Sequence, residues 1–232
     1  MPDTQPKTTR FVLTSASLLA ALAGYINTIF LSLYLLPVSH LSGTLSRFSL
    51  DISKLDLGDL RQISGILVGF LFGAMLSGLI IGNSSVQLGR RYGVMLILEG
   101  LFLGLSALLL ETLPILAVSF ASLACGIQNG MASNYRGMII RTTHVTGVIT
   151  DLGVLLGRWL RHKKVDTWQF ALLVLTLFAF VVGGLFGAVM MRFFLGKALW
   201  FASGITVSVG SLYLAWRQYL FVFKKDLSKN AF

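Results

Sequence analysis

The composition of this chain is that of a membrane protein. Of its 232 residues, 55% are apolar and only 12% are charged, whereas soluble domains carry about 25% charged residues. The net charge is +10. In a membrane protein the first function of Lys and Arg is to fix the orientation in the bilayer, so this charge does not by itself indicate nucleic-acid binding. The lone Cys125 excludes an internal disulfide and a cysteine-based metal cluster.

Six apolar stretches predict membrane spans, because roughly 20 helical residues cross a hydrocarbon core of about 30 Å. We expect these spans at residues 11–36, 62–82, 92–110, 115–133, 170–191 and 199–216. A cleaved signal peptide is an alternative for the first stretch, since basic residues precede it and Ala21–Ala23 has a small-x-small pattern. The apolar run continues past Ala23, and the corresponding stretch later in the chain, residues 114–133, cannot be a signal, which favours a span.

Two motifs occur twice, about a hundred residues apart. His40–Gly43 reads HLSG and His144–Gly147 reads HVTG, and each follows an apolar stretch with a Gly-x-x-Asn motif, at Gly24–Asn27 and Gly126–Asn129. The interval from glycine to histidine differs by only two residues between the copies. We interpret this as a duplicated unit. The run Gly69–Ala74 and the run Gly183–Ala188 are predicted to be the same element of the two copies.

Each copy contains three predicted spans, and an odd number requires the copies to lie in the membrane in opposite orientations. The predicted fold is an all-α integral membrane protein with six transmembrane helices as two inverted three-helix repeats. Broken or re-entrant segments are expected at the two H-x-[ST]-G motifs. The predicted divisions are a tail at 1–10, repeats at 11–112 and 113–217, and a basic tail at 218–232.

The distribution of Lys and Arg predicts the orientation independently. With the N-terminus inside, fourteen of the 19 basic residues fall on the cytoplasmic side. The opposite side has only Arg47, Lys54, Arg61, Arg192 and Lys197. By the positive-inside rule both termini are expected in the cytoplasm.

The motifs resemble those of the DUF1275 (YoaK-like) family of bacterial inner-membrane proteins. The resemblance rests on Gly24–Asn27 with His40–Gly43, and on Gly126–Asn129 with Arg141–Asp151, and it covers essentially the whole chain. It implies a multi-pass protein of the inner membrane and no particular activity. The chain departs from the family pattern at Asn27, where an acid is common, at Thr44, where Asn is common, and at His144, where Tyr is common.

The two repeated motifs suit the beginnings of helices, because hydroxyl residues cap free amide groups and glycine permits close backbone approach. Two helix N-termini that point inward from opposite sides favour an anionic solute. The plainer alternative is that Ser42 and Thr146 cap interfacial helices and that Arg47 and Arg141 contact lipid phosphate. The predicted solute site comprises Asn27, His40, Ser42, Gly43, Arg47, Gln128, Asn129, Arg141, His144, Thr146, Gly147 and Asp151.

Glu99 is the predicted ion-coupling residue, because an acid within a span usually marks an ion path or a buried pair. The alternative interpretation is that Glu99 is a protonated carboxyl group, or one that reaches the membrane interface, near the end of the span. The amides of Asn27, Gln128 and Asn129 either line the site or form hydrogen bonds between helices. The histidines could shuttle protons, but no second His or Cys stands at ligand spacing, so no metal site is expected.

We interpret the chain as a secondary transporter or channel-like protein for a small solute, anionic by preference, with alternating access provided by the inverted repeats. The alternative is a non-transporting membrane scaffold or partner subunit, and a homodimer through the glycine-rich helix faces is a further expectation. No catalytic motif is visible, so neither an enzyme nor a cofactor is expected. The expected partners are the lipid bilayer and the solute, without nucleic acid.

Overall fold

A computed structural model describes residues 6–54, 57–81, 90–131, 134–135, 138–139 and 142–229. The described chain is almost entirely helical, which agrees with the predicted all-α class. Its elements are α1 (Pro6–Tyr34), α2 (Leu41–Lys54), α3 (Leu57–Ile81), α4 (Arg90–Leu109), α5 (Pro114–Gly130), β1 (Asn134–Tyr135), β2 (Met138–Ile139), α6 (Val145–Leu160), α7 (Thr167–Phe194), the 3-10 turn η1 (Leu195–Lys197) and α8 (Ala198–Lys229). The two short strands pair antiparallel.

The helices end where the sequence makes continuation costly. Leu35 follows α1 with a φ of 55°, and Pro37 comes two residues later, where its ring and missing N–H would break a helix. Leu195 ends α7 with a φ of 49°. Pro114 is the first residue of α5, a position where its fixed φ is favourable and its missing N–H is not needed.

Four described stretches are long and apolar enough to cross a membrane. They are Thr9–Tyr34, Leu57–Ile81, Arg90–Leu109 and Thr167–Leu220. The last is a single apolar run that contains α7, η1 and most of α8. Helix α5 is also apolar but has only 17 residues. Large apolar side chains are widely exposed on the outer faces of these helices, for example Leu79 at 74% and Leu185 at 64%, as expected for surfaces that contact lipid.

The observed helices differ in length from the predicted spans. Helix α3 begins at Leu57 and so takes in the end of the mixed segment that precedes the predicted second span. Helix α8 continues to Lys229, through most of the region predicted as a tail. Hydropathy marks only the part of a helix that is apolar, whereas a backbone helix continues into polar sequence as long as no Pro interrupts it. Helix α6 begins directly after His144, in agreement with the prediction that the repeated motif begins a helix.

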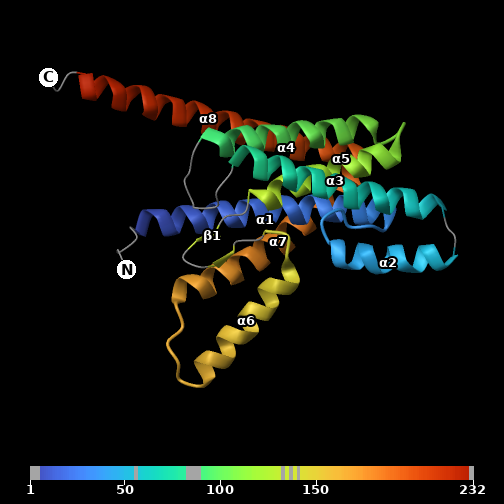
Figure 1. Ribbon diagram of the computed structural model, residues 1–232, viewed down its shortest axis with the longest axis horizontal. Helices are drawn as coiled ribbons and strands as arrows, with labels where there is room; N and C mark the ends of the chain where they lie inside the picture. The colour runs from blue at the N-terminus through green and yellow to red at the C-terminus, as the bar shows by residue number, and fades with distance from the viewer. Residues whose placement is uncertain are drawn as a thin grey trace.

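Within the described chain, three of the four main helix contacts join helices that are not neighbours in the sequence. Helix α1 packs along α7, α3 packs along α5, and α4 packs along both α5 and α8. Figure 1 shows these helices as an elongated bundle, with α2 beside one end of it and the hairpin of α6 and the start of α7 standing off from it. Both ends of the chain lie at the same end of the bundle (Figure 1).

Glycines bring two of these helix pairs into backbone contact. A Cβ added at Gly24 of α1 would overlap the carbonyl oxygen of Phe180 in α7. A Cβ added at Gly126 of α5 would likewise overlap the carbonyl oxygen of Phe70 in α3. The two glycines of the repeated Gly-x-x-Asn motif therefore have the same function in both pairs, which is to let the backbones approach closely.

The glycine contacts correct the predicted register between α3 and α7. Gly73 faces the carbonyl of Leu123, and Gly183 faces the carbonyl of Ala21. Gly73 therefore corresponds to Gly183 and not to Gly187, which is a shift of one helical turn from the sequence alignment. Both helices carry several glycines four residues apart, so the sequence motif alone permits either alignment.

A candidate solute site where two helix N-termini meet

The segment after α1 doubles back along that helix. The Ser39 N–H donates to Asn27 Oδ1 at 3.1 Å, and Asn27 Nδ2 donates to Ser39 Oγ at 2.6 Å and to the Ala23 carbonyl at 3.0 Å. Since α1 continues from Asn27 to Tyr34, Ser39 lies about 10 Å back from the helix end at 1.5 Å per residue. Helix α2 therefore starts beside α1 and not beyond it.

A matching arrangement precedes α6. Thr143 Oγ1 donates to Asn129 Oδ1 at 2.7 Å, and Asn129 Nδ2 donates to the Cys125 carbonyl at 2.9 Å. Next to it, Gln128 Nε2 lies 2.9 Å from Thr142 Oγ1 and 2.6 Å from the carbonyl oxygen of Leu19 in α1. The segment before α6 is thus held to α5 as the segment before α2 is held to α1.

We call these two arrangements the first clamp (Asn27 with Ser39) and the second clamp (Asn129 with Thr143). In each clamp the asparagine amide bonds to the carbonyl four residues earlier and to a hydroxyl residue that directly precedes the histidine. Both asparagines are among the residues predicted for the site, whereas Ser39 and Thr143 are not. The signal was present, because a hydroxyl residue stands before the histidine in both copies.

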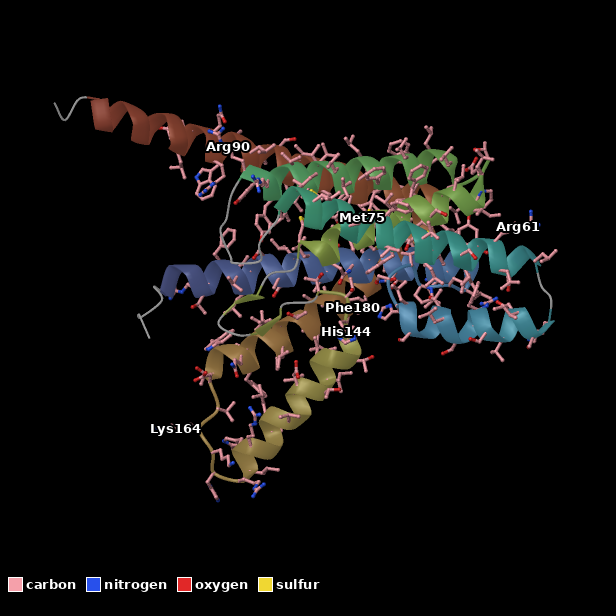
Figure 2. The ribbon with its side chains drawn as sticks, viewed as in Figure 1. Arg61, Met75, Arg90, His144, Lys164 and Phe180 are labelled. Carbon is pink, nitrogen blue, oxygen red and sulfur yellow. The ribbon has the colours of Figure 1, made fainter. Side chains whose placement is uncertain are left out.

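The clamps bring the two histidines near each other. The half-buried ring of His40 lies edge-on to Phe180 of α7, with 5.7 Å between the ring centroids. Burial of His40, and to a smaller extent the charge of nearby His144, lower the pKa of His40 from its usual 6.5. His144 and Phe180 both lie at the base of the hairpin of α6 and α7 in Figure 2. The two repeated motifs therefore lie near each other, which the sequence could not show.

The meeting point is also the start of two helices. Helix α2 begins at Leu41, directly after His40, and α6 begins at Val145, directly after His144. From this point α2 and α6 run towards opposite ends of the molecule (Figure 1). Ser42, Gly43 and Thr146 are exposed there. The positive ends of two helix dipoles and their first-turn amides are thus directed to one region.

The hydroxyl of Thr146 does not cap α6, contrary to the sequence prediction. The N-cap residue is His144, without a side-chain capping hydrogen bond, and Thr146 already lies inside the first turn. The two glycines of the motifs also differ. A Cβ on Gly147 would overlap the His144 ring, whereas the space beside Gly43 is open. Gly147 therefore makes room for His144, and Gly43 leaves the first turn of α2 accessible.

The predicted charged residues of the site do not gather at the histidines. Arg47 NH2 lies 2.7 Å from Asp59 Oδ2 of α3, and its Nε lies 3.7 Å from Asp51 Oδ2. Its charge is therefore balanced by two carboxylates, and its predicted contact with solute stays a prediction. Asp151 is exposed on α6, and Arg141 lies outside the described residues.

Glu99 is fully buried on α4, between the fully buried Met95 and Leu103 one turn to either side. Neither of its carboxylate oxygens has a hydrogen-bond partner within the described residues. Cys125 of α5 is close enough to interact with it electrostatically. A carboxyl group without partners in an apolar interior is costly as a charge, so this position favours the protonated acid or a bound counter-ion.

Metal ligation finds no support in the part of the chain that the structure describes. Within it, no three side chains of His, Cys, Asp or Glu are grouped so that they could hold an ion. His40 and His144 form a pair, whereas structural zinc sites have four protein ligands and catalytic sites have three.

The fold and the site define a class: an all-helical protein whose apolar helices indicate a membrane location, with two asparagine-clamped segments that meet at helix N-termini. The chain belongs to the family described as "Protein of unknown function (DUF1275)", which matches residues 15–212. This agrees with the resemblance seen in the motifs. Comparison with curated proteins and with solved structures finds no match.

Proposed function

We propose that the protein is a secondary transporter for a small anionic solute, built from two inverted three-helix repeats. The first repeat comprises α1, α3 and α4 with the half-length helix α2, and the second comprises α5, α7 and α8 with α6. Two features support this division. In both halves the asparagine amide donates to the carbonyl four residues earlier and bonds to the hydroxyl residue before the histidine. The glycines of the same motif pack α1 on α7 and α5 on α3.

The observation that carries the proposal is the convergence of the two H-x-[ST]-G motifs. Inverted-repeat transporters bind solute where discontinuous helices from the two halves meet. His40 and His144 lie at such a junction, with the exposed first turns of α2 and α6 beside them. First-turn amides and positive dipole ends attract anions, and this is the reason for the proposed solute class.

The proposed topology has six membrane crossings, with both termini in the bacterial cytoplasm. The run Thr167–Leu220 has 54 residues and at 1.5 Å per residue would be about 80 Å long as one helix. Two crossings accommodate it, with the reversal at Leu195 between them. Figure 2 shows Arg61 at one end of the bundle and Arg90 and Lys164 towards the other, which supports the predicted separation of charge.

Glu99 is proposed to couple transport to protons. Its carboxylate is fully buried and lacks hydrogen-bond partners among the described residues, so a change of its protonation alters the energy of the state that buries it. A substitution that removes the ionisable group while keeping its shape, Glu99→Gln, abolishes uphill transport and leaves solute exchange intact.

The test is flux into liposomes that contain the purified protein. The panel includes halides, phosphate and mono- and dicarboxylates, with neutral sugars for comparison. We expect the double variant His40→Gln/His144→Gln to reduce anion flux at least tenfold, because both side chains at the junction are replaced. His162→Gln is the matched control, since the third histidine is exposed at the end of α6, and its flux should equal that of the unmodified protein.

Three outcomes decide the proposal. Anion flux that depends on His40 and His144 but not on His162 supports it. Equal flux in all three proteins removes the histidine junction as the site. If no member of the panel crosses in any liposome preparation while circular dichroism shows a folded protein, the scaffold interpretation takes its place.

A further inference from the structure

The far end of the hairpin formed by α6 and the start of α7 carries a dense group of basic residues. Arg158, Arg161, Lys163 and Lys164 are all exposed, and none has an ion pair within the described residues. Figure 2 shows Lys164 at the tip of the hairpin, remote from His144 at its base. The cluster is therefore separate from the proposed solute site.

These side chains are not needed to cap α6. Basic residues near a helix C-terminus can bond its free carbonyls, but here the backbone does so. The Arg161 N–H donates to the carbonyls of Gly157 and Arg158 at 3.2 Å, the His162 N–H to that of Trp159 at 2.9 Å, and the Lys163 N–H to that of Arg158 at 3.1 Å. Four cations thus remain available for an external anion.

The same hairpin exposes apolar side chains next to the charges. Ile149, Leu156 and Leu160 lie seven and four residues apart, on one face of α6, and are 56%, 46% and 70% exposed. Trp159 is 65% exposed beside them. Helix α6 packs against α7 through other side chains, in a cluster that contains Val148, Leu155 and Leu173. The exposed face therefore has no partner in the described chain.

We propose that the tip of this hairpin binds the headgroups of anionic lipids, while the exposed apolar face of α6 lies among the acyl chains. The positive charge of this cluster indicates which ligand binds there. Four unpaired cations complement phosphate groups, and a tryptophan next to an apolar stripe and basic residues is the pattern of a helix end at a membrane interface. A soluble anion would satisfy the charges but would leave Trp159, Leu160 and Leu156 in water.

Helix α2, which corresponds to α6 in the proposed repeats, carries no such cluster. It ends at Lys54, and Arg47 on the same helix is already paired with Asp51 and Asp59. The proposed lipid site therefore belongs to the hairpin of α6 and α7 and does not depend on whether the protein transports a solute.

The test is a titration of the detergent-solubilised full chain with phosphatidylglycerol, monitored by melting temperature. Phosphatidylcholine with the same acyl chains and the soluble headgroup glycerol 3-phosphate are the comparison ligands. We expect phosphatidylglycerol alone to raise the melting temperature. Each charge removed weakens this binding about fivefold, so Lys163→Gln/Lys164→Gln raises the half-maximal lipid concentration roughly 25-fold, and the variant that also carries Arg158→Gln and Arg161→Gln loses the response.

Two variants make the result specific. Arg192→Gln/Lys197→Gln removes two exposed cations near the other end of α7 and should leave the lipid response unchanged, and Arg158→Lys/Arg161→Lys should keep it. The proposal is wrong if the Lys163→Gln/Lys164→Gln protein responds like the unmodified chain. It is equally wrong if phosphatidylcholine stabilises as strongly, or if glycerol 3-phosphate reproduces the effect.

Discussion

Asn27 and Asn129 show how one side chain can redirect a chain inside an apolar interior. A primary amide has donors and an acceptor. It can therefore form a hydrogen bond within its own helix and another to the segment that follows the helix. Asn27 does this with the Ser39 backbone and hydroxyl, and Asn129 with the Thr143 hydroxyl. A carboxylate could not donate, and this chain has Asn at both positions.

Replacing Asn27 with Leu should destabilise the protein. The substitution leaves the buried Ser39 N–H without its acceptor, at a cost of about 1–3 kcal/mol. In a chain of this size that lowers the melting temperature by roughly 2–4 °C per kcal/mol. Ser32→Ala is the control, because the Ser32 hydroxyl is exposed and bonds only its own helix at Thr28. A melting temperature for Asn27→Leu equal to that of Ser32→Ala would contradict the clamp.

His40 should make stability fall on acidification. Its pKa in the folded protein is lowered from 6.5 by burial and by His144, so the unfolded chain binds more protons between the folded pKa and 6.5. Above pH 6.5 His40 therefore does not reduce the free energy of unfolding. That free energy falls as the pH drops below 6.5, by at most about 1.4 kcal/mol per pH unit for one proton. Melting temperatures from pH 7.5 to 5 should show a smaller slope for His40→Gln than for His162→Gln. Identical slopes would exclude His40 as the cause.

At the scale of elements, most of the extensive contacts join helices that are not neighbours in the sequence, although α4 also packs on the following helix α5. Helix α1 packs on α7, and α3 packs on α5, so each half of the chain contributes to both pairs. Side-chain hydrogen bonds also connect segments at single points. The Ser122 hydroxyl lies near the carbonyls of Val38 and Ile66, and the Tyr25 hydroxyl donates to the Ala198 carbonyl. In lipid, close backbone contact and such bonds replace the hydrophobic drive between helices.

Gly126→Ala should therefore separate α5 from α3. The new methyl group meets the Phe70 carbonyl, a backbone atom that cannot rotate away, and overpacking of this kind costs about 1–3 kcal/mol. Gly204→Ala in α8 is the matched control, since nothing lies within 4 Å of a Cβ there and Ala favours a helix over Gly by about 1 kcal/mol. We expect a lower melting temperature for the first variant and an equal or higher one for the second. The reverse order would refute the packing.

At the scale of the whole molecule, the proposed topology places the tip of the hairpin of α6 and α7 and the turn η1 on opposite sides of the membrane. The start of α1 and the end of α8 lie at one end of the bundle (Figure 1), and Figure 2 shows Arg90 and Lys164 towards the same end. The junction of the histidines lies between the two ends, as a site with alternating access requires.

Single cysteines can test this topology, because the native Cys125 is fully buried and should not react. Lys164→Cys and Lys197→Cys place a thiol at exposed positions of the hairpin tip and of η1. A membrane-impermeant maleimide applied to intact cells should label the Lys197→Cys protein and, only after the membrane is broken, the Lys164→Cys protein. Labelling of both from the same side would overturn the inverted arrangement.

The sequence by itself determined the helical class, the family, the helix starts after both histidines and the asparagines of the clamps. These follow from local quantities, namely hydropathy, proline position and repeated motifs, each of which acts within one element. Only the tertiary structure decided that the two motifs lie near each other, that Arg47 is paired with Asp51 and Asp59, that Gly73 corresponds to Gly183, and that the N-cap of α6 is His144 and not Thr146. These depend on contacts between residues far apart in the chain, which a repeated motif permits but does not specify.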